Sequence, residues 1–153
     1  MAEVLADSAP AATRLAPAQL AGLRVGDRLP PLQLPPVSRL TLALYCGASG
    51  DHNPIHVDSD FARAAGQADV FAHGMLSMAW LGRLLTDWVP QQALRRFDVR
   101  FAAITHVGEA IRCTGEVAEI VVEQGERRAR LLLQTTDEAG QIKLQGEAVV
   151  ALG

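Results

Sequence analysis

The stretch from Met75 to Val89 is the most apolar part of the chain, and it constrains the fold more than any other segment. Arg83, Thr86 and Asp87 make a narrow polar stripe at helical spacing, and Pro90 ends the stretch. A helix that is apolar on nearly every side is a buried helix. We therefore predict a central helix over 75–89, on the order of 20–25 Å long at about 1.5 Å per residue.

The last third of the chain has the period of strands that bury one face. Apolar and polar residues alternate in four stretches, at 97–101, 111–118, 129–135 and 142–150. The segments 123–126 and 137–140 contain glycine and polar residues, as hairpin turns do. Antiparallel sheets covered on one side show this alternation. Because helix 75–89 is the candidate for the covering element, we predict an antiparallel sheet curled around one central helix.

The segments before the central helix indicate one domain with a loose start. Residues 1–20 are rich in Ala and Pro without a clear period, which predicts a flexible N-terminal arm and a folded domain over 21–153. Four prolines between positions 29 and 37 favour an extended edge segment.

Two short helices are expected between that edge segment and the central helix. Ser38 can cap the first, which runs to about Ala48 with apolar residues at helical spacing, namely Leu40, Leu44 and Ala48. The second is expected from Asp58 to Ala65 and is stopped by Gly66, with two residues pointing inward, Phe61 and Ala62.

Composition and charge exclude several classes of protein. The 153 residues suit one domain, and 49% hydrophobic with 20% charged residues is ordinary for a globular chain. A net charge of −3 gives no electrostatic reason to expect nucleic acid or an anionic membrane as a partner. No run approaches the roughly 20 apolar residues of a membrane span. Glu3 and Asp7 make the N-terminus a poor secretory signal, so we expect a cytoplasmic protein with two reduced cysteines, Cys46 and Cys113.

The turn from Asp51 to His56 concentrates groups that can transfer protons. An aspartate and a histidine in one tight loop can share a water molecule, accept its proton and donate one elsewhere. A plainer interpretation stays open, in which Asp51 and Asn53 only cap the following turn. His52 and His56 are four residues apart, but Pro54 lies between them and no third ligand stands at a recognised spacing. We therefore expect no metal.

Gly74 stands where the central helix begins, after Ala72 and His73. The first backbone N–H groups of a helix lack internal partners and carry the positive end of its dipole. A glycine there lets a ligand approach the backbone, and its N–H could stabilise an enolate that forms on a thioester carbonyl. The alternative is that Gly74 simply starts the helix. For His73 we expect a hydrogen-bonded scaffold role.

Together, these two segments resemble the hydratase motif of the MaoC-like family. They read Tyr45-Cys46-Gly47-Ala48-Ser49-Gly50-Asp51-His52-Asn53-Pro54-Ile55-His56 and Ala72-His73-Gly74-Met75-Leu76, with Asp58, Ala62 and Gly66 between them. The opening Val25-Gly26-Asp27 and the strand Phe97-Asp98-Val99-Arg100-Phe101 are also similar to the family, so the resemblance covers roughly residues 22–152. It implies the hot-dog fold, an α+β arrangement in which a sheet wraps around one long helix.

The resemblance also implies an activity and a role for each matching residue. The family includes (R)-specific enoyl-CoA hydratases and (3R)-hydroxyacyl-thioester dehydratases, which are lyases of fatty-acid and related acyl metabolism. Asp51 and His56 match its catalytic pair, Gly74 its oxyanion-binding glycine and Asn53 a residue that orients the loop. Some members carry a serine about two turns into the central helix; that position is Gly82 here, so we assign no serine role.

The substrate, the cofactor and the partners follow as expectations. We expect reversible hydration of trans-2-enoyl thioesters to (3R)-hydroxyacyl thioesters, with no cofactor and with the acyl group on coenzyme A or on the phosphopantetheine of an acyl carrier protein. Four arginines could contact those phosphates or could simply be solvated: Arg83, Arg95, Arg96 and Arg100. The family is usually dimeric or larger, so we expect a homodimer in which the strand around 94–104 takes part. The alternatives are a hot-dog acyl-thioesterase and a non-catalytic hot-dog subunit of a hetero-oligomer.

Overall fold

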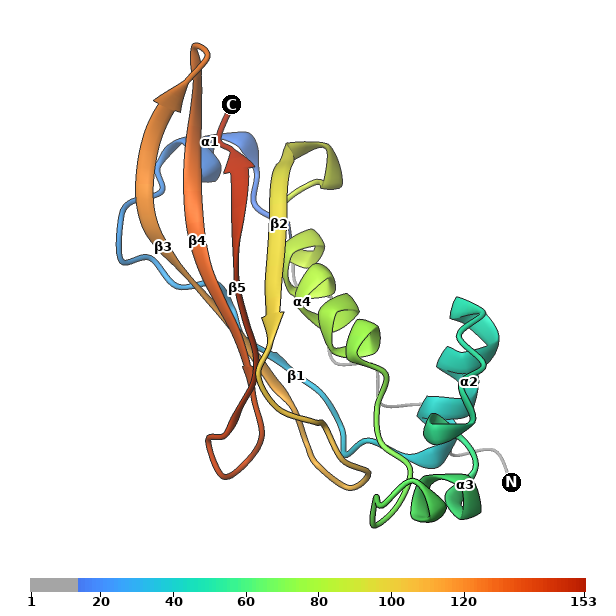
Figure 1. Cartoon of the computed structure of the whole chain (residues 1–153). Coiled ribbons are helices and arrows are strands. Elements are labelled where there is room, and N and C mark those ends of the chain that lie inside the picture. The colour runs from blue at the N-terminus through green and yellow to red at the C-terminus, as the bar shows by residue number, and fades with distance from the viewer. Residues whose placement is uncertain (1–13) are drawn as a thin grey trace, which may run out of the picture.

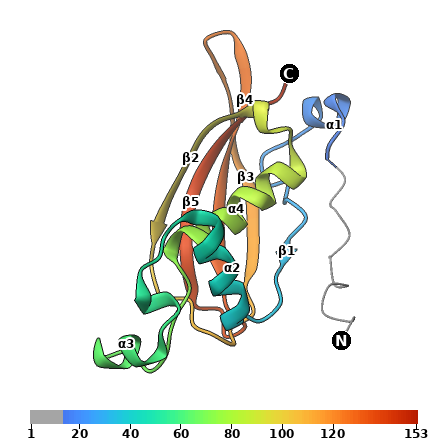
Figure 2. The same ribbon diagram turned by 90° about the vertical axis from the view of Figure 1, so that its right-hand side faces the viewer.

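The computed structural model describes residues 14–153, and in it a curled antiparallel sheet wraps around one long helix (Figure 1). The five strands lie in the order β1-β3-β4-β5-β2, and every neighbouring pair is antiparallel. Their bounds are β1 (Leu32–Gln33), β2 (Leu94–Phe101), β3 (Arg112–Glu123), β4 (Glu126–Thr136) and β5 (Ile142–Ala151). Helix α4 (Gly74–Trp88) lies along the concave face of the sheet, as Figures 1 and 2 show. The α+β arrangement predicted from the two periods is confirmed.

The core lies between α4 and the concave face. The helix contributes Leu81 and Leu85, both fully buried, and the strands contribute Val117, Leu131 and Ala148, which are also fully buried. The prediction that α4 is buried on nearly every side is wrong for one strip, because Met75 is 54% exposed and Ala79 is exposed as well. The sheet covers only one side of the helix, and this strip stays exposed among residues 14–153.

The strands follow the predicted alternation. In β4, Ala129, Leu131, Leu133 and Thr135 are buried and the residues between them are more exposed. The predicted hairpin at 123–126 joins β3 to β4. Its two central residues, Gln124 and Gly125, have φ angles of 54° and 78°, as a type I′ turn requires. The second predicted turn joins β4 to β5 at 137–141.

The segments at the start of the chain pack more closely than expected where they are described. The predicted arm falls mainly on residues 1–13, which lie outside the described residues. Of its remainder, α1 (Pro17–Ala21) is a short helix and Leu20 packs in the core, 7% exposed. The predicted edge segment is confirmed, because β1 pairs with β3 at the end of the sheet.

Two helices and a 3-10 turn, η1 (Pro54–His56), connect β1 to α4. Helix α2 (Arg39–Ser49) begins at the predicted Ser38, whose Oγ accepts a hydrogen bond from the Thr41 N–H at 3.0 Å. The predicted apolar row is nevertheless exposed, with Leu40 at 58% and Leu44 at 65%. The buried residues of α2 are Leu42 and Cys46.

The second short helix, α3 (Ser59–Ala64), has the predicted Asp58 as its N-cap. Ala62 is buried as predicted, but Phe61 is 47% exposed, so its predicted inward position is wrong. Figure 2 shows α2 on the side of α4 that faces away from the sheet. Helices in this position contact the core along a narrow line, so their other apolar residues stay at the surface.

Among residues 14–153, the structure contains no helix with the length and apolarity that crossing a membrane requires.

Candidate active site

The turn that follows α2 holds Asp51 in an exposed position. Gly50 ends the helix with a φ of 74°, and Asp51 comes next. One carboxylate oxygen of Asp51 accepts the Asn53 N–H at 3.3 Å, and the Asn53 side chain in turn accepts the Ile55 N–H at 3.2 Å. Asn53 thus starts η1 and determines where His56 points. Asp51 has a capping contact as well, but its second carboxylate oxygen makes no hydrogen bond within residues 14–153.

His56 is buried, 8% exposed, and its tautomer follows from one hydrogen bond. Its Nδ1 lies 2.8 Å from the carbonyl oxygen of Phe71. Because a carbonyl only accepts, Nδ1 carries the hydrogen and the Nε2 of the neutral ring has a free lone pair. His56 therefore presents a base, and the phenyl ring of Phe71 packs edge-on against the imidazole at 5.0 Å between ring centroids.

His73 lies against the face of His56. The two rings stack with centroids 3.9 Å apart, and the His73 Nε2–H donates to the Asp51 carbonyl oxygen at 3.2 Å. Burial lowers the pKa of His73, and so does the neighbouring His56, although the bond to Asp51 acts in the opposite direction. The ring is therefore held neutral, and its buried Nδ1 has no hydrogen-bond partner within residues 14–153. The predicted scaffold role agrees with these contacts.

One oxygen of Asp51 and one ring nitrogen each of His56 and His73 lie within 4.8 Å of one another. In the described part of the chain, no other group brings three potential metal ligands together. Stacked rings point their nitrogen lone pairs in nearly parallel planes, 28° apart here, so the lone pairs do not converge as metal coordination needs. A separation of up to 4.8 Å suits one bridging water molecule, which makes hydrogen bonds of about 2.8 Å on each side.

Gly74 is the first residue of α4, and a side chain there would force a neighbour to move. A Cβ at this position would lie 2.9 Å from the Cε1 of Phe101, at the end of β2. The N–H of Gly74 has no acceptor within residues 14–153, as is usual in the first turn of a helix. The aromatic contact with Phe101 is something that no sequence pattern could indicate, because the two residues meet only in the fold.

A mainly apolar cavity of about 340 Å³ lies beside Gly74. Phe71 and Gly74 line it together with residues 101–105. Two polar side chains reach it, Ser77 and Thr105, which are buried and hydrogen-bonded to each other at 3.3 Å. The sequence analysis assigned a role to neither. Ser77 stands one turn into the helix, and Thr105 could not be linked to it from 28 positions away.

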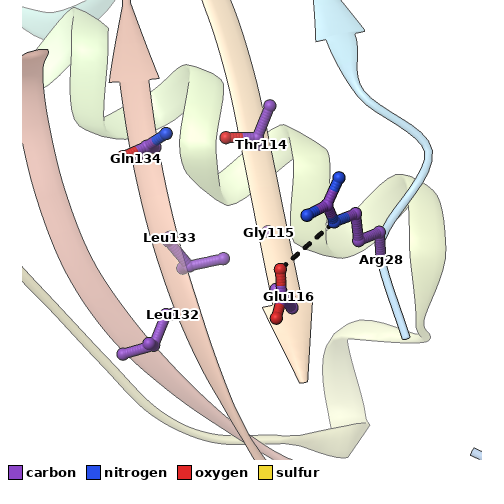
Figure 3. A pocket seen from close by; sticks show the side chains of 7 residues that line it. All are labelled: Arg28, Thr114, Gly115, Glu116, Leu132, Leu133 and Gln134. Atoms are coloured by element: carbon purple, nitrogen blue, oxygen red, sulfur yellow. Dashed lines mark hydrogen bonds and ion pairs between the residues drawn. The ribbon is translucent and has the colours of Figure 1, made fainter. Parts of the chain in front are cut away.

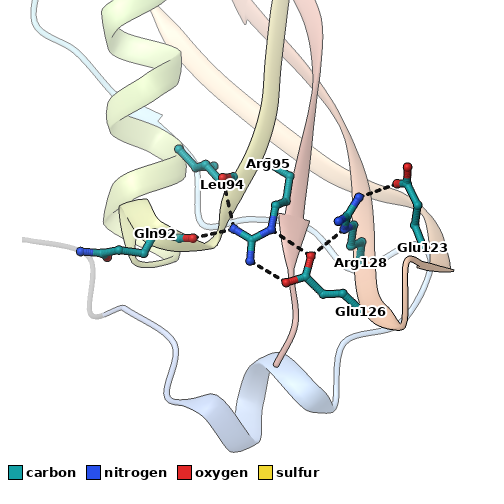
Figure 4. Close-up of polar contacts among 6 residues, drawn as sticks. All are labelled: Gln92, Leu94, Arg95, Glu123, Glu126 and Arg128. Carbon is teal, nitrogen blue, oxygen red and sulfur yellow. Dashed lines mark hydrogen bonds and ion pairs between the residues drawn. The ribbon is translucent and has the colours of Figure 1, made fainter.

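The structure does not gather the four arginines that were expected near the substrate phosphates. Arg83 pairs with Asp87 at 3.4 Å and Arg96 pairs with Asp98. Arg95 donates two hydrogen bonds to Glu126, at 2.9 and 2.5 Å, in a network that also includes Arg128 and Glu123 (Figure 4). Since a strand rises about 3.3 Å per residue, Arg95 lies about 20 Å along β2 from the Phe101 end. Arg100 has no acidic partner within residues 14–153 and hydrogen-bonds the side-chain amide of Gln145.

In a larger hollow on the convex face of the sheet, the two charged side chains that line it, Arg28 and Glu116, are paired with each other. It lies between β3, β4 and Arg28, and α4 is behind the strands in this view (Figure 3). Arg28 forms an ion pair with Glu116 at 3.2 Å across its edge. Exposed ion pairs of this kind contribute little and leave no unpaired charge to react.

The comparisons with known proteins agree with the fold. The (R)-specific enoyl-CoA hydratase of Rhodospirillum rubrum is 28% identical over 116 residues, which are 74% of this chain and 78% of that protein. The 3-hydroxybutyryl-CoA dehydratase of Methylorubrum extorquens is 31% identical over 108 residues, 69% of this chain and 67% of that protein. The unliganded R-hydratase of Pseudomonas aeruginosa superposes with a TM-score of 0.75 at 27% identity and covers 86% of this chain and 84% of that one. These structural neighbours confirm the hot-dog fold.

The matched region includes α4, every strand except β5, and the turn that holds Asp51 and His56. The family model described as MaoC like domain matches residues 27–138, from the loop before β1 to the turn after β4. Both Asp51 and Gly74 lie inside this range. Since the matched range is well over half of the residues, the chain belongs to the MaoC-like domain family.

Proposed function

We propose that the protein is a hydro-lyase that reversibly adds water to trans-2-enoyl thioesters and forms (3R)-hydroxyacyl thioesters. The observation that carries this proposal is the group of Asp51 and His56, with reactive atoms no more than 4.8 Å apart. His56 contacts Phe71, and Phe71 and Gly74 both line the apolar cavity. The relatives named as hydratases and dehydratases support the same class of reaction.

The proposed reaction starts with a water molecule held between Asp51 and His56 Nε2. As the water oxygen bonds to C3 of the enoyl group, the pair takes up its proton, and the electrons of the double bond move onto the thioester oxygen. The Gly74 N–H stabilises that oxygen at the positive end of the α4 dipole. The pair then returns the proton to C2 on the same face, which makes the addition syn. Burial lowers the pKa of His73, which disfavours a positive charge that would weaken the neighbouring His56 as a base.

Nothing in this sequence of steps needs an electron carrier or an activated group, so we propose that no cofactor takes part. The acyl group would arrive on coenzyme A or on the phosphopantetheine of a carrier protein. Among the four arginines, Arg100 best suits a phosphate, because its partner Gln145 is neutral while the others face carboxylates. The two cysteines are free and buried, which supports a reducing compartment such as the cytoplasm.

We also propose that the working form is a homodimer closed along β2. In the sheet order, β2 is the last strand and pairs only with β5 on one side. Apolar side chains near its Phe101 end are exposed: Phe101 at 50%, Ile104 at 40% and Met75 at 54%. A second copy against this edge would cover them and the open side of the cavity. A monomeric mass in light scattering at enzyme concentrations used for kinetics would contradict this assembly.

A single assay separates the proposed activity from the other two functions that the fold allows. Purified protein is mixed with crotonyl-CoA, and both the loss of the enoyl absorbance and the release of free thiol are followed. The hydratase loses the enoyl signal without releasing thiol, and an (R)-specific dehydrogenase then oxidises its product. Thiol release at the same rate would identify a thioesterase. If neither the enoyl absorbance nor the free thiol changes, with the enoyl group on coenzyme A or on a carrier protein, the protein is a non-catalytic subunit.

A further inference from the structure

One side of the cavity is a short loop that other parts of the chain hold in place. This wall segment (residues 102–105) follows β2, and all four of its residues line the cavity. Its Thr105 carbonyl accepts the Ala72 N–H at 2.9 Å, two residues before Gly74. Its Ala102 and Ala103 N–H groups both donate to the backbone carbonyl of Lys143, at 2.8 and 3.2 Å. The position of the wall segment therefore depends on β5.

The side chain of Lys143 holds the same loop a second time. Its Nζ lies 3.1 Å from the carbonyl oxygen of Ile104, a wall residue, and 2.8 Å from Glu109 Oε1. Two further oxygens are in reach, Gln141 Oε1 at 2.9 Å and Asp137 Oδ2 at 3.1 Å. Lys143 does not line the cavity itself; the next residue, Leu144, does, as the alternation of a strand requires.

The burial of the Lys143 ammonium group is unusual, because few lysine side chains lose all contact with water. The Lys143 side chain is 1% exposed, and a buried ion pair is often no more stabilising than apolar residues of similar volume. Burial alone would raise the pKa of Asp137, but hydrogen bonds from the Gln141 N–H and from Lys143 hold it below its ordinary value, so the carboxylate stays charged. An ammonium with several oxygen partners determines geometry more strictly than an apolar side chain would.

The chain contains a similar group elsewhere that does not touch the cavity. Arg128 contacts two carboxylates at 2.6 Å, those of Glu123 and Glu126, and its side chain is only 13% exposed. It lies at the opposite end of the sheet, beside Arg95 (Figure 4). Both cations pair with two carboxylates, but only Lys143 binds the carbonyl of a residue in the cavity wall. This difference separates a contribution to stability from a contribution to substrate choice.

We propose that Lys143 is a positioning residue that sets the depth of the acyl cavity by holding the wall segment, and thereby selects the length of the acyl chain. The proposal rests on the proposed function in one respect, that the acyl chain occupies this cavity. When the ammonium is removed, the Ile104 carbonyl loses its partner and the wall segment can move away from Gly74. A longer chain then fits, while the Asp51 and His56 pair stays in place.

The test compares Lys143→Met with the matched control Arg128→Met on enoyl-CoA substrates of increasing chain length. For Lys143→Met, the ratio of kcat/KM for a long chain to that for a short chain should change by about tenfold, since one methylene in a pocket changes kcat/KM by 10-fold or more. Most of the change should appear in KM. Arg128→Met should lose thermal stability without a change in this ratio. An unchanged ratio in Lys143→Met, or an equal change in Arg128→Met, overturns the proposal.

Amide hydrogen exchange gives a readout that does not depend on activity. The Ala102 and Ala103 amides should exchange faster in Lys143→Met than in the wild-type protein, and at the wild-type rate in Arg128→Met. If wild-type protein hydrates no enoyl thioester, the proposed function fails, and the exchange rates still decide whether Lys143 holds the wall. Unchanged exchange in Lys143→Met rejects that role even if the enzyme is active.

A milder variant covers the case in which Lys143→Met does not fold. Glu109→Gln keeps the lysine but removes the carboxylate that lies closest to its ammonium. It should shift the chain-length ratio and the Ala103 exchange rate in the same direction as Lys143→Met, by less. Wild-type values of both quantities in Glu109→Gln would overturn the proposal.

Discussion

The two ends of α4 are built for different purposes. At the Trp88 end, other parts of the chain donate hydrogen bonds to carbonyl groups of the last helical turn. The Leu15 N–H donates to the Trp88 carbonyl at 3.0 Å, and Arg14 donates to the Thr86 carbonyl at 2.8 Å. Arg95, Glu126 and Arg128 join the strands just beyond it (Figure 4). At the Gly74 end, the first N–H has no acceptor within residues 14–153, and a cavity lies beside it.

This contrast shows how one helix can serve both stability and chemistry. Unsatisfied amides cost little in an open site where water or a ligand can reach them, but they would be costly in a closed core. At the Trp88 end, side-chain and backbone donors occupy the carbonyl groups of the last helical turn. The Gly74 end leaves polar groups free for substrate. Changes at one end should therefore alter reaction rates, and changes at the other should alter stability.

The largest effect is expected at the Gly74 end, in the proton-transfer pair. Asp51→Asn and His56→Ala should each lower kcat for crotonyl-CoA hydration by about 10²–10⁴-fold, because a general acid–base group contributes that much. Far-ultraviolet circular dichroism should show an unchanged fold. His52→Ala, which changes an exposed neighbour in the same turn, is the control and should keep wild-type kcat. Near-wild-type kcat in either dyad variant would reject the assignment.

The next effect is expected near the Trp88 end, in the core. Leu85 is fully buried, so Leu85→Ala should lower the free energy of unfolding by about 2–5 kcal/mol through lost burial and a new cavity. Urea titration measures the change, and kcat per folded molecule should not fall. Leu40→Ala, at a position that is 58% exposed, should be close to neutral. A loss of kcat in Leu85→Ala, at a temperature where it stays folded, would show that the two ends are coupled.

A smaller effect on rate is expected when the space at Gly74 is filled. In Gly74→Ala, the new methyl group meets the ring of Phe101 at 2.9 Å, so the ring or the helix start must move. A displacement of this size should lower kcat/KM on the order of 10- to 100-fold. Gly82→Ala is the matched control on the same helix, because its Cβ would be 3.7 Å from Phe97, an ordinary contact. Equal kcat/KM values in the two variants would show that the contact between Gly74 and Phe101 does not affect the reaction.

His73 should make stability at the Gly74 end depend on pH. Burial holds its folded-state pKa below the ordinary value of 6.5, so the folded protein binds fewer protons than the unfolded chain. The free energy of unfolding should therefore fall as the pH drops below about 6.5. His73→Gln keeps a donor for the Asp51 carbonyl but does not titrate. Denaturation at several pH values should show a flatter dependence in this variant, and an unchanged dependence would mean that His73 is not held neutral.

The smallest effect is expected at the Trp88 end in acid. Hydrogen bonds from Arg95 and Arg128 lower the pKa of Glu126 from 4.5 to about 2. Its contribution to stability should be complete above pH 4.5 and should disappear as the pH falls towards 2. Glu126→Gln should therefore have a lower Tm than the wild-type protein at pH 7 and a similar Tm near pH 2. The same Tm difference at both pH values would show that the network is not electrostatic.

Local patterns in the sequence predicted the elements better than their packing. Apolar residues that recur with periods of 3.6 and 2 predicted α4 and the four long strands, because an element buried on one face has apolar residues at regular intervals. They could not say which side of α2 or α3 meets the core: Leu44 is exposed although it belongs to an apolar row, and Phe61 was wrongly predicted to point inward. That choice depends on where a helix lies against the sheet, and neither helix has a wide apolar face.

The candidate site was predictable where its residues are close in sequence. Asp51, Asn53 and His56 belong to one turn, and Gly74 is marked by the start of an apolar helix. The stack of His56 on His73 brings together residues 17 positions apart, and the bond from Lys143 to Ile104 spans 39 positions. No local pattern carries such contacts, since they arise only when the sheet curls around α4.

The hydrogen bond from His56 to the Phe71 carbonyl has a consequence for how this enzyme can change. The four residues from Phe71 to Gly74 hold the acceptor that sets the protonated nitrogen of the proposed base, and they also lead into the helix whose first residue lines the cavity. A shift of this short backbone would move the base and the oxyanion contact together. Selection can enlarge or reshape the cavity through the loop after β2, but it cannot adjust the two halves of the proposed reaction separately.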